Sequence, residues 1–226
     1  MDDFTEYFGT SVYGIIRDTG EIYKEIDIKQ KEWKKSSPAQ CPRGCGKCCH
    51  NFEPDLFESE ALYMAAWILK NQPEKAEALI NGTFTPYRQD SNLPENGCIL
   101  YDPDTEYHCT VYEGRGFICR LFGYSGDRDK NGKIRWVPCK FIPEKKLSGK
   151  FRHRQYTQEE IQEELGILPP VMQDLMGQVP SLTPDNTTTE PLRTALPKAL
   201  KKLKLLLSFT VPPEPNSPAP TTPSAA

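Results

Sequence analysis

The sequence predicts a mainly α-helical protein with an irregular, loop-rich middle and a few short strands; an α+β fold with a small sheet is the alternative. Three observations favour this prediction. Apolar residues recur at helical spacing near both ends of the 226-residue chain. Between residues 92 and 140 apolar runs are short, and glycine and aromatic residues are frequent. All eight cysteines lie between Cys41 and Cys139, which leaves both ends of the chain without any.

The first half of the chain is predicted to hold three helices. The first covers residues 11–35, where apolar residues recur at roughly helical spacing, with Gly20 as a point of interruption. A second helix is expected to follow the first cysteines and to run to about residue 70, with Asp55 or Ser59 as its N-cap. Pro73 suits the first turn of a third, short helix.

Residues 92–140 are predicted to form loops with short strands. Asn131 and Gly132 are typical of a hairpin turn, and residues 133–137 would form the strand that follows it. The spacing of Asp127, Asp129 and Asn131 also resembles the first half of a calcium-binding EF-hand loop. Because the twelfth position of that loop is Pro138 and no helices flank it, we interpret the segment as a polar hairpin.

The last third of the chain is predicted to contain two helices joined by a polar linker. Thr157 and Glu160 form a capping box for the first of them. The second, over residues 197–209, is basic and amphipathic. Such a helix could bind a membrane surface or a protein partner, but we favour docking on the body of the same protein.

These elements divide the chain into four parts. They are an N-terminal helical segment (1–36), a cysteine-cluster domain (37–145), a C-terminal helical extension with its linker (146–210) and a proline-rich tail expected to be disordered (211–226).

Composition narrows the classes of function. Hydrophobic residues make up 37% of the chain and the formal net charge is −3, which argues against nucleic acid as a partner. No apolar run reaches the roughly 20 residues of a membrane span, and the N-terminus does not resemble a signal peptide. We therefore expect a cytoplasmic protein, in which clustered cysteines more often bind metal or do redox chemistry than form disulfides.

The first four cysteines form a local motif, in which Cys41, Cys45, Cys48 and Cys49 are separated by three, two and no residues. Such short gaps let a tight turn direct several sulfur atoms at one point, as tetrahedral zinc or an iron–sulfur cluster requires. Glycines on both sides of Cys45 favour the backbone angles of such a turn.

The other four cysteines are too widely spaced for a local motif, so they can complete a site only through the fold. The adjacent side chains of Cys48 and Cys49 are expected to diverge, so that they serve two neighbouring metals, or one binds metal while the other does redox work. Eight thiolates fit two four-ligand sites, or one cluster plus a separate metal or thiol pair. The candidate metal ligands are Cys41, Cys45, Cys48, Cys49, Cys98, Cys109, Cys119 and Cys139.

Other polar residues stand next to the cysteines in sequence. His50 and His108 are candidate imidazole ligands, although we interpret them as polar neighbours on exposed loops. Five cations could offset the negative charge of a metal–thiolate centre, and these are Arg43, Lys47, Arg115, Arg120 and Lys140.

Two other interpretations of the cysteines are disfavoured. A disulfide scaffold is disfavoured because the chain has no signal peptide. The spacing of Cys41, Cys45 and Cys48 also matches that of radical S-adenosylmethionine enzymes. Those enzymes usually have an aromatic residue where this chain has Lys47, and they need a series of strand–helix units that the sequence does not show.

The cysteine blocks resemble the YkgJ family of cysteine-cluster proteins, a zinc- or iron-chelating family with a CxxCxxCC signature. The first block is Cys45-Gly46-Lys47-Cys48-Cys49 with the helix that opens after it. The second comprises residues 97–100, 108–115 and 118–122, with their Cys-x-Val-Tyr-Glu and Cys-Arg-x-Phe sequences. Two departures are that Gly116 stands where the family commonly has proline, and that the last cysteine is delayed to Cys139.

The resemblance implies metal binding through a loop-rich, metal-binding core, with zinc, iron or an iron–sulfur cluster as the bound group. Flagellin lysine methylases carry a similar cysteine cluster and are linked to S-adenosylmethionine. By analogy, the alternative function is that of an iron–sulfur enzyme, either a redox protein or an S-adenosylmethionine-linked protein methyltransferase.

Overall fold

The computed structural model describes residues 3–41, 45–87, 96–147, 149, 151–183 and 188–209. Within these ranges the chain forms eight α-helices and five strands of two or three residues, which confirms the mainly helical fold class. The helices are α1 (Tyr13–Ser36), α2 (Lys47–His50), α3 (Glu58–Asn71), α4 (Pro73–Asn81), α5 (Phe117–Leu121), α6 (Gln158–Leu165), α7 (Met172–Met176) and α8 (Leu192–Phe209). The strands are β1 (Asp55–Leu56), β2 (Asp127–Arg128), β3 (Ile134–Trp136), β4 (Tyr156–Thr157) and β5 (Glu190–Pro191). Short 3₁₀ helices cover Thr5–Tyr7, Glu144–Lys146 and Val179–Leu182.

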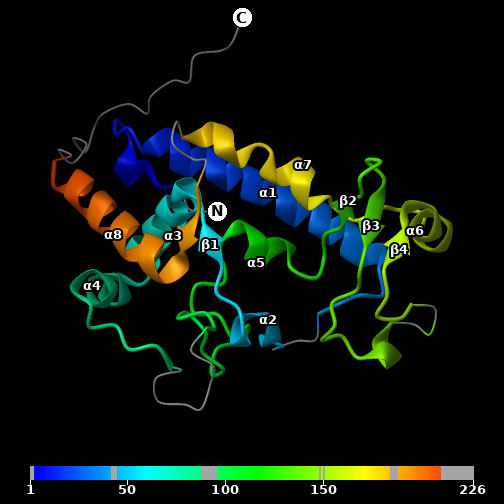
Figure 1. The fold of residues 1–226 in the computed structure, drawn as a ribbon. Coiled ribbons are helices and arrows are strands. Elements are labelled where there is room, and N and C mark those ends of the chain that lie inside the picture. The colour runs from blue at the N-terminus through cyan, green and yellow to red at the C-terminus, as the bar shows by residue number, and fades with distance from the viewer. Residues whose placement is uncertain are drawn as a thin grey trace, which may run out of the picture.

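Helix α1 runs along the whole molecule and links its two ends (Figure 1). At one end it packs against α3, which in turn packs against α8, and α4 lies beside both. At the other end lies the small sheet β2–β3–β4 with α6. The short helices α5 and α2 lie between these two ends (Figure 1), in the region where the cysteines are found.

Helix α3 is the centre of the helical end. Nine of its 14 residues are buried, because its sequence Ala-Leu-Tyr-Met-Ala-Ala-Trp-Ile-Leu is apolar around nearly the whole helix. Neither Asp55 nor Ser59 caps it. Asp55 lies in β1, Ser59 is buried in the first helical turn, and the N-cap is Phe57, whose backbone N–H donates to the Glu60 carboxylate at 3.0 Å. The pairing of β1 with β5 places the start of α3 beside the start of α8.

The buried apolar side chains form two separate clusters. The main one joins α1, α3, α4, α5 and α8 and includes the buried Cys98. The second lies at the sheet end, where the rings of Trp33 and Trp136 meet edge to face with centroids 5.3 Å apart. Helix α1 contributes to both, because Ile16 and Ile26 lie in the first cluster and Trp33 in the second. Gly20 does not interrupt this helix, which begins at Tyr13 rather than Ser11.

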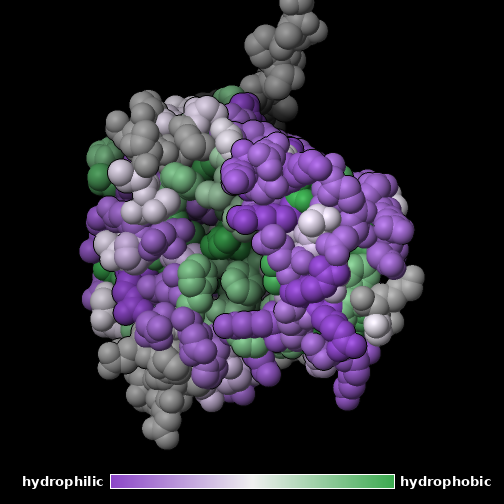
Figure 2. Space-filling view, turned by 45° about the vertical axis from the view of Figure 1, so that its right-hand side comes forward, coloured by the Kyte–Doolittle hydropathy of each residue, from purple (hydrophilic) through white to green (hydrophobic). Residues whose placement is uncertain are grey.

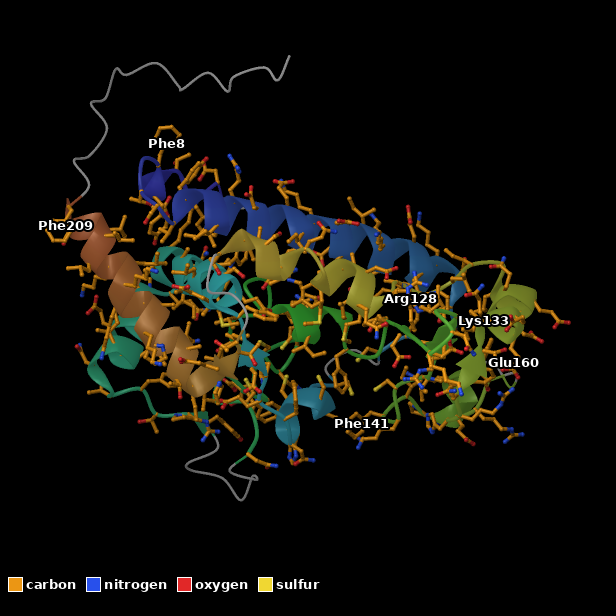
Figure 3. All side chains as sticks on the ribbon, turned by 45° about the horizontal axis from the view of Figure 1, so that its top comes forward. Phe8, Arg128, Lys133, Phe141, Glu160 and Phe209 are labelled. Carbon is orange, nitrogen blue, oxygen red and sulfur yellow. The ribbon has the colours of Figure 1, made fainter. Side chains whose placement is uncertain are left out.

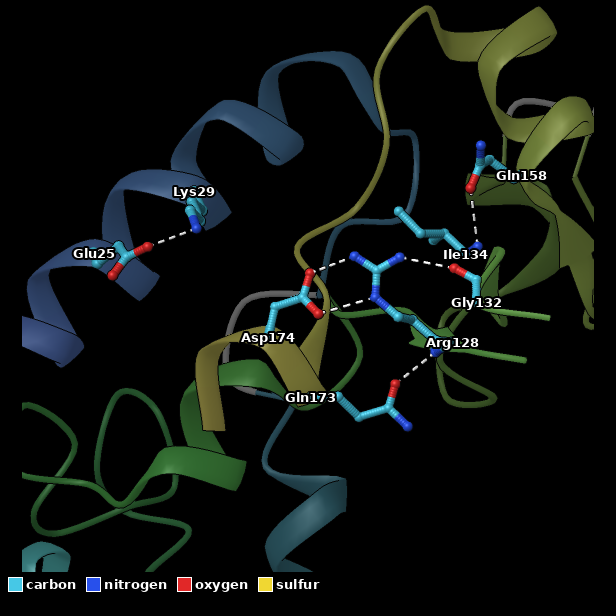
Figure 4. A network of polar contacts seen from close by, with 8 residues as sticks. All are labelled: Glu25, Lys29, Arg128, Gly132, Ile134, Gln158, Gln173 and Asp174. Atoms are coloured by element: carbon cyan, nitrogen blue, oxygen red, sulfur yellow. Dashed lines mark hydrogen bonds and ion pairs between the residues drawn. The ribbon is translucent and has the colours of Figure 1, made fainter. Parts of the chain in front are cut away.

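The hairpin prediction is confirmed. Strands β2 and β3 are antiparallel, and the Asp129 carboxylate accepts the backbone N–H groups of Asn131 and Lys133, which stabilises the turn. Helix α7 packs on the hairpin through a bidentate pair of Arg128 with Asp174 (Figure 4). The sequence reasoning did not predict α7, whose five residues are too few to show a period.

The C-terminal helix docks on the body of the protein, as predicted. Leu196, Leu200 and Leu203 are buried in the main cluster, and on the other face lysines pair with acidic residues of the body, as Lys202 does with Glu58 at 2.7 Å. The helix begins at Leu192, five residues before the expected start, and therefore contains Pro197 near its N-terminal end. Phe209 at its other end projects away from the body (Figure 3). Among the described residues no helix is long and apolar enough to cross a membrane.

The capping box of α6 is also confirmed. The backbone N–H of Thr157 donates to the Glu160 carboxylate at 2.8 Å, and the backbone N–H of Glu160 donates to the Thr157 hydroxyl at 3.3 Å. The expected linker over residues 181–190 is only partly described, and the expected disordered tail over residues 211–226 lies outside the described residues.

A buried polar network holds α5 between α1 and α3. The Glu60 carboxylate accepts the backbone N–H of Phe117 at the start of α5 and lies 3.5 Å from the Tyr23 hydroxyl of α1. Burial raises the pKa of Glu60, while the two backbone donors at Phe117 and Phe57 oppose that shift. Arg120, 3% exposed, pairs with Asp27 of α1 at 3.0 Å.

Arg120 also closes the loop before α5. Its guanidinium donates to the carbonyl groups of Glu113 and Arg115 and stacks on the Tyr23 ring, with 4.2 Å between guanidinium carbon and ring centroid. The positive charge of Arg120 is therefore paired with Asp27 and with backbone carbonyl groups, and its guanidinium does not face the cysteines.

Replacement of Arg120 by alanine should lower the free energy of unfolding by about 3 kcal/mol, because it leaves two carbonyl groups and a half-exposed carboxylate without their donor. The matched control is R128A, which breaks the exposed pair with Asp174 and should cost less than about 1 kcal/mol. Chemical denaturation followed by circular dichroism measures both. Equal losses in the two variants would contradict the anchoring role of Arg120.

Candidate metal centre

The fold brings distant cysteines to one cavity of about 410 Å³. None of the eight is in a disulfide. The cavity lies between α2, α5 and the loop over residues 98–115, and its wall includes Cys41, Cys45, Cys48, Cys49, Cys98, Cys109 and Cys119. Cys139 does not line the cavity but lies beside Gly123, next to the cavity residue Tyr124. The fold thus brings seven of the eight cysteines, from both sets, to the wall of one cavity.

Hydrophobic residues gather in a hollow on the face seen in Figure 2, and hydrophilic residues surround that hollow. The cavity wall has the same mixed character: apolar and aromatic side chains such as Phe52 and Phe122 stand beside the thiols and two cations. Neither Asp nor Glu nor His is among its described lining residues.

A tight turn positions Cys48 and Cys49. Gly46 adopts a left-handed backbone angle (φ +51°) at the N-cap of α2, and its carbonyl group accepts the backbone N–H of Cys49 at 3.0 Å. The prediction that the two side chains diverge is wrong, since both line the cavity and their sulfur atoms are 3.8 Å apart. That separation is about what two thiolates on one tetrahedral ion require, given metal–sulfur bonds of about 2.3 Å.

The contact between the two thiols shifts their pKa values in opposite directions. A hydrogen bond from the Cys49 thiol lowers the pKa of Cys48 to about 7, while the same contact and burial raise the pKa of Cys49.

Backbone contacts bring the later cysteines to the same place. The Cys98 backbone N–H donates to the carbonyl group of Cys49 at 3.1 Å, and Cys109 pairs with Tyr101 in an isolated β-bridge. Cys119 sits on α5, which the network of Glu60 and Arg120 holds in place. Burial raises the pKa of both Cys109 and Cys119.

Of the five cations noted in the sequence, Arg115 lies at the cavity. It stacks on Tyr112 with 3.8 Å to the ring centroid, and its charge helps to lower the pKa of Cys48. A second cation, Lys34 at the end of α1, was not foreseen; it lies 4.1 Å from the ring centroid of Tyr124. The local sequence does not indicate its role, because Lys34 belongs to the preceding helix and not to the cysteine motif. Neither cation forms an ion pair with a described carboxylate.

The remaining charged neighbours are placed elsewhere. Lys47 and Lys140 both approach the ring of Phe141, at 6.0 and 5.1 Å from its centroid, and Figure 3 shows Phe141 beside α2. Arg43 lies outside the described residues.

The two histidines differ from each other. His50, the last residue of α2, contacts the amide oxygen of Asn51 at 3.1 Å. His108 is not the exposed polar neighbour that was expected, because its Nδ1 is buried without a hydrogen-bond partner among the described residues and its backbone is left-handed (φ +53°). It packs against Gly46, in the turn that carries the first cysteines.

The chemistry of these donors fits a metal that prefers sulfur. Beside them lies the buried imidazole nitrogen of His108, which has no hydrogen-bond partner in the part of the chain that the structure describes. The described residues do not, however, hold any three Cys, His, Asp or Glu side chains in the geometry of a ready metal site.

Gly46→Ala should lower the free energy of unfolding by about 3 kcal/mol, because a Cβ there would lie 2.3 Å from the His108 ring in addition to the cost of the left-handed backbone. Gly82→Ala is the matched control: Gly82 is also left-handed (φ +71°) but faces open space, so about 1 kcal/mol is expected. Thermal and chemical denaturation measure the difference. Similar losses in both would mean that the close approach of His108 is unimportant.

Comparison with known proteins agrees with the chemistry of the cavity. A search of curated proteins and a search of solved structures each returned no match. One family model matches, described as "CxxCxxCC: Putative zinc- or iron-chelating domain", over residues 40–159. The match begins just before Cys41, ends after Cys139, and covers more than half of the chain. This chain belongs to the CxxCxxCC family of zinc- or iron-chelating domains.

Proposed function

We propose that the protein binds zinc, iron or an iron–sulfur cluster through the cysteines of this cavity, with Cys139 joining them from the adjacent segment. The observation that carries the proposal is that seven thiols from four separate stretches of sequence line one cavity. Chance packing of small apolar residues would not gather them, and none of the eight is in a disulfide.

The absence of carboxylates from the described cavity wall narrows the class of metal. Calcium and magnesium prefer oxygen ligands, whereas zinc and iron accept thiolates. Four thiolates on a divalent ion leave a net charge of about −2. Arg115 and Lys34 supply two positive charges at the cavity and would stabilise such a centre.

Protein purified without oxygen should contain stoichiometric zinc or iron, and the double variant C45S/C48S should lose most of it. Metal analysis and the visible spectrum distinguish zinc from iron, and acid-labile sulfide identifies a cluster. R128A, whose side chain pairs with Asp174 and does not line the cavity, should keep the wild-type metal content. A wild-type protein that neither contains nor takes up zinc or iron would overturn the proposal.

A second candidate function is that of an enzyme whose metal centre takes part in the reaction. The cavity volume of about 410 Å³ lies within the range of small-molecule sites and exceeds the needs of a metal ion. Three of its aromatic side chains are also exposed, namely Phe52 (41%), Phe122 (36%) and Tyr107 (42%). Such side chains could receive the apolar or aromatic part of an organic ligand.

S-adenosylmethionine is the ligand to test, because of the cysteine cluster that flagellin lysine methylases share. Calorimetry on the metal-loaded protein should show binding that weakens at least about tenfold, or by about 1.4 kcal/mol, in the double variant F52A/Y107A. F209A, at the exposed end of α8, is the matched aromatic control and should bind as the wild type does. If calorimetry detects no binding of S-adenosylmethionine to the metal-loaded protein, an S-adenosylmethionine-dependent enzyme is excluded, while the proposal of metal binding is unaffected.

A further inference from the structure

Two positively charged side chains line the cavity, and no described carboxylate balances them. Lys34 comes from the last turn of α1, and Arg115 comes from the loop before α5. Neither forms an ion pair with a described carboxylate, and no described hydrogen bond joins either side chain to a cysteine sulfur. Arg120 shows the contrast, because its guanidinium has Asp27 and two carbonyl groups as partners. The described part of the chain therefore leaves cationic donors available at the cavity.

Aromatic rings hold both cations in place. The Lys34 ammonium lies 4.1 Å from the ring centroid of Tyr124, and the Arg115 guanidinium lies 3.8 Å from that of Tyr112. Arg115 also donates one N–H to the Tyr112 carbonyl group at 2.5 Å, and Tyr107 stacks on Tyr112 with ring centroids 4.0 Å apart. Contact with a ring fixes the position of a positive charge without neutralising it.

The two cations lie close enough to repel each other. Burial and the positive charge of Arg115 lower the pKa of Lys34. The negative charges of Asp27 and Cys41 oppose that shift only in part, and Asp27 is already paired with Arg120. Partly buried like charges without a counter-ion are unfavourable, because water solvates them incompletely. A negative group bound at both side chains would relieve that cost, so this part of the wall favours an anion.

The rest of the wall suits a planar, apolar group. Phe52 and Phe122 lie with ring centroids 6.3 Å apart, and both rings are partly exposed, as Tyr107 is. The buried side chains of Leu100 and Val111 also line the cavity. Aromatic side chains of this kind stack against other planar groups. A cavity of about 410 Å³ has room for such a group beside a metal ion.

A carboxylate suits these two cations better than a phosphate does. A guanidinium presents parallel N–H donors that match the two oxygens of a carboxylate, and the ammonium adds a second, point-like charge. A phosphate dianion loses more hydration free energy than a carboxylate when it enters a wall made largely of apolar and aromatic side chains and thiols.

We propose that the cavity is a binding site for an organic carboxylate, whose carboxylate group binds Lys34 and Arg115. The planar, apolar body of this ligand lies against Phe52, Phe122 and Tyr107. The ligand is additional to the metal of the proposed function, and its site depends on the cavity wall rather than on the identity of the metal.

Saturation-transfer NMR on the full, zinc-loaded chain tests the site with three probes that share a phenyl ring. Benzoate should bind with a dissociation constant below about 1 mM, and neutral benzyl alcohol at least about tenfold more weakly. Phenyl phosphate should also bind more weakly than benzoate. A wild-type protein that binds benzoate no better than benzyl alcohol would overturn the proposal, and tighter binding of phenyl phosphate would overturn the choice of a carboxylate.

Variants then locate the bound carboxylate. K34M and R115M should each weaken benzoate binding about tenfold, because each removes one charge and keeps an apolar side chain. K35M is the matched control, since Lys35 lies in the same turn of α1 but is exposed and does not line the cavity. R115K keeps the charge and should lose less affinity than R115M. Unchanged binding in both K34M and R115M would contradict the site, because the carboxylate would then be held elsewhere.

Circular dichroism identifies any variant that fails to fold, and the preference of the wild type for benzoate over benzyl alcohol decides the matter without it. Metal content measured on the same samples separates this site from the proposed function. Loss of metal from K34M and R115M, with no benzoate binding by the wild type, would mean that the two cations serve the metal centre alone. Benzoate binding by a wild type that takes up neither zinc nor iron would refute the proposed function and leave the carboxylate site in place.

Discussion

The buried contacts of Glu60 and Arg120 are the constraint on which the cysteine region depends. Helix α5 has only five residues, too few to be stable by itself, and it carries Cys119. It is fixed because the Glu60 carboxylate accepts its first backbone N–H and the Arg120 guanidinium binds Asp27 of α1. A carboxylate and a guanidinium with almost no exposure are costly to bury, so each is surrounded by partners.

This arrangement gives separate roles to the two residues of the Cys-Arg pair. Cys119 faces the cavity, while the next side chain, that of Arg120, points to α1 and is occupied by Asp27, Tyr23 and two carbonyl groups. The positive charge at the cavity comes instead from Arg115 and Lys34. Sequence adjacency to a cysteine is thus a poor guide to electrostatic contact with its sulfur, since neighbouring residues on a helix point about 100° apart.

The sequence was sufficient for the helices and turns whose signals are local. The capping box of Thr157 and Glu160 and the hairpin at Gly132 depend on contacts within a few residues, and both were predicted correctly. The N-cap of α3 was not predicted correctly. It is Phe57, whose side chain cannot cap a helix, and the Glu60 carboxylate instead accepts the Phe57 backbone N–H. The start of α8 was predicted at Pro197, five residues too far along the chain. The helix begins at Leu192, whose side chain packs in the main cluster.

The candidate site was predictable in its chemistry but not in its arrangement. Clustered cysteines and the motif at Cys41 to Cys49 identified the donor type, and the family match over residues 40–159 agrees. The contribution of Lys34 and the burial of His108 Nδ1 arise only from long-range packing. The glycines beside Cys45 indicated the tight turn that Gly46 forms, but not that this turn brings the Cys48 and Cys49 thiols close together.

The participation of α1 in both hydrophobic clusters has a consequence for how the chain can vary over evolution. Ile26 packs in one cluster and Trp33 in the other, and a continuous helix fixes the angle between them. Substitutions on the exposed face between these residues leave that angle intact. Insertion or deletion of one residue there would rotate Trp33 by about 100° and remove it from Trp136. Length is therefore more constrained than identity along this stretch of the helix.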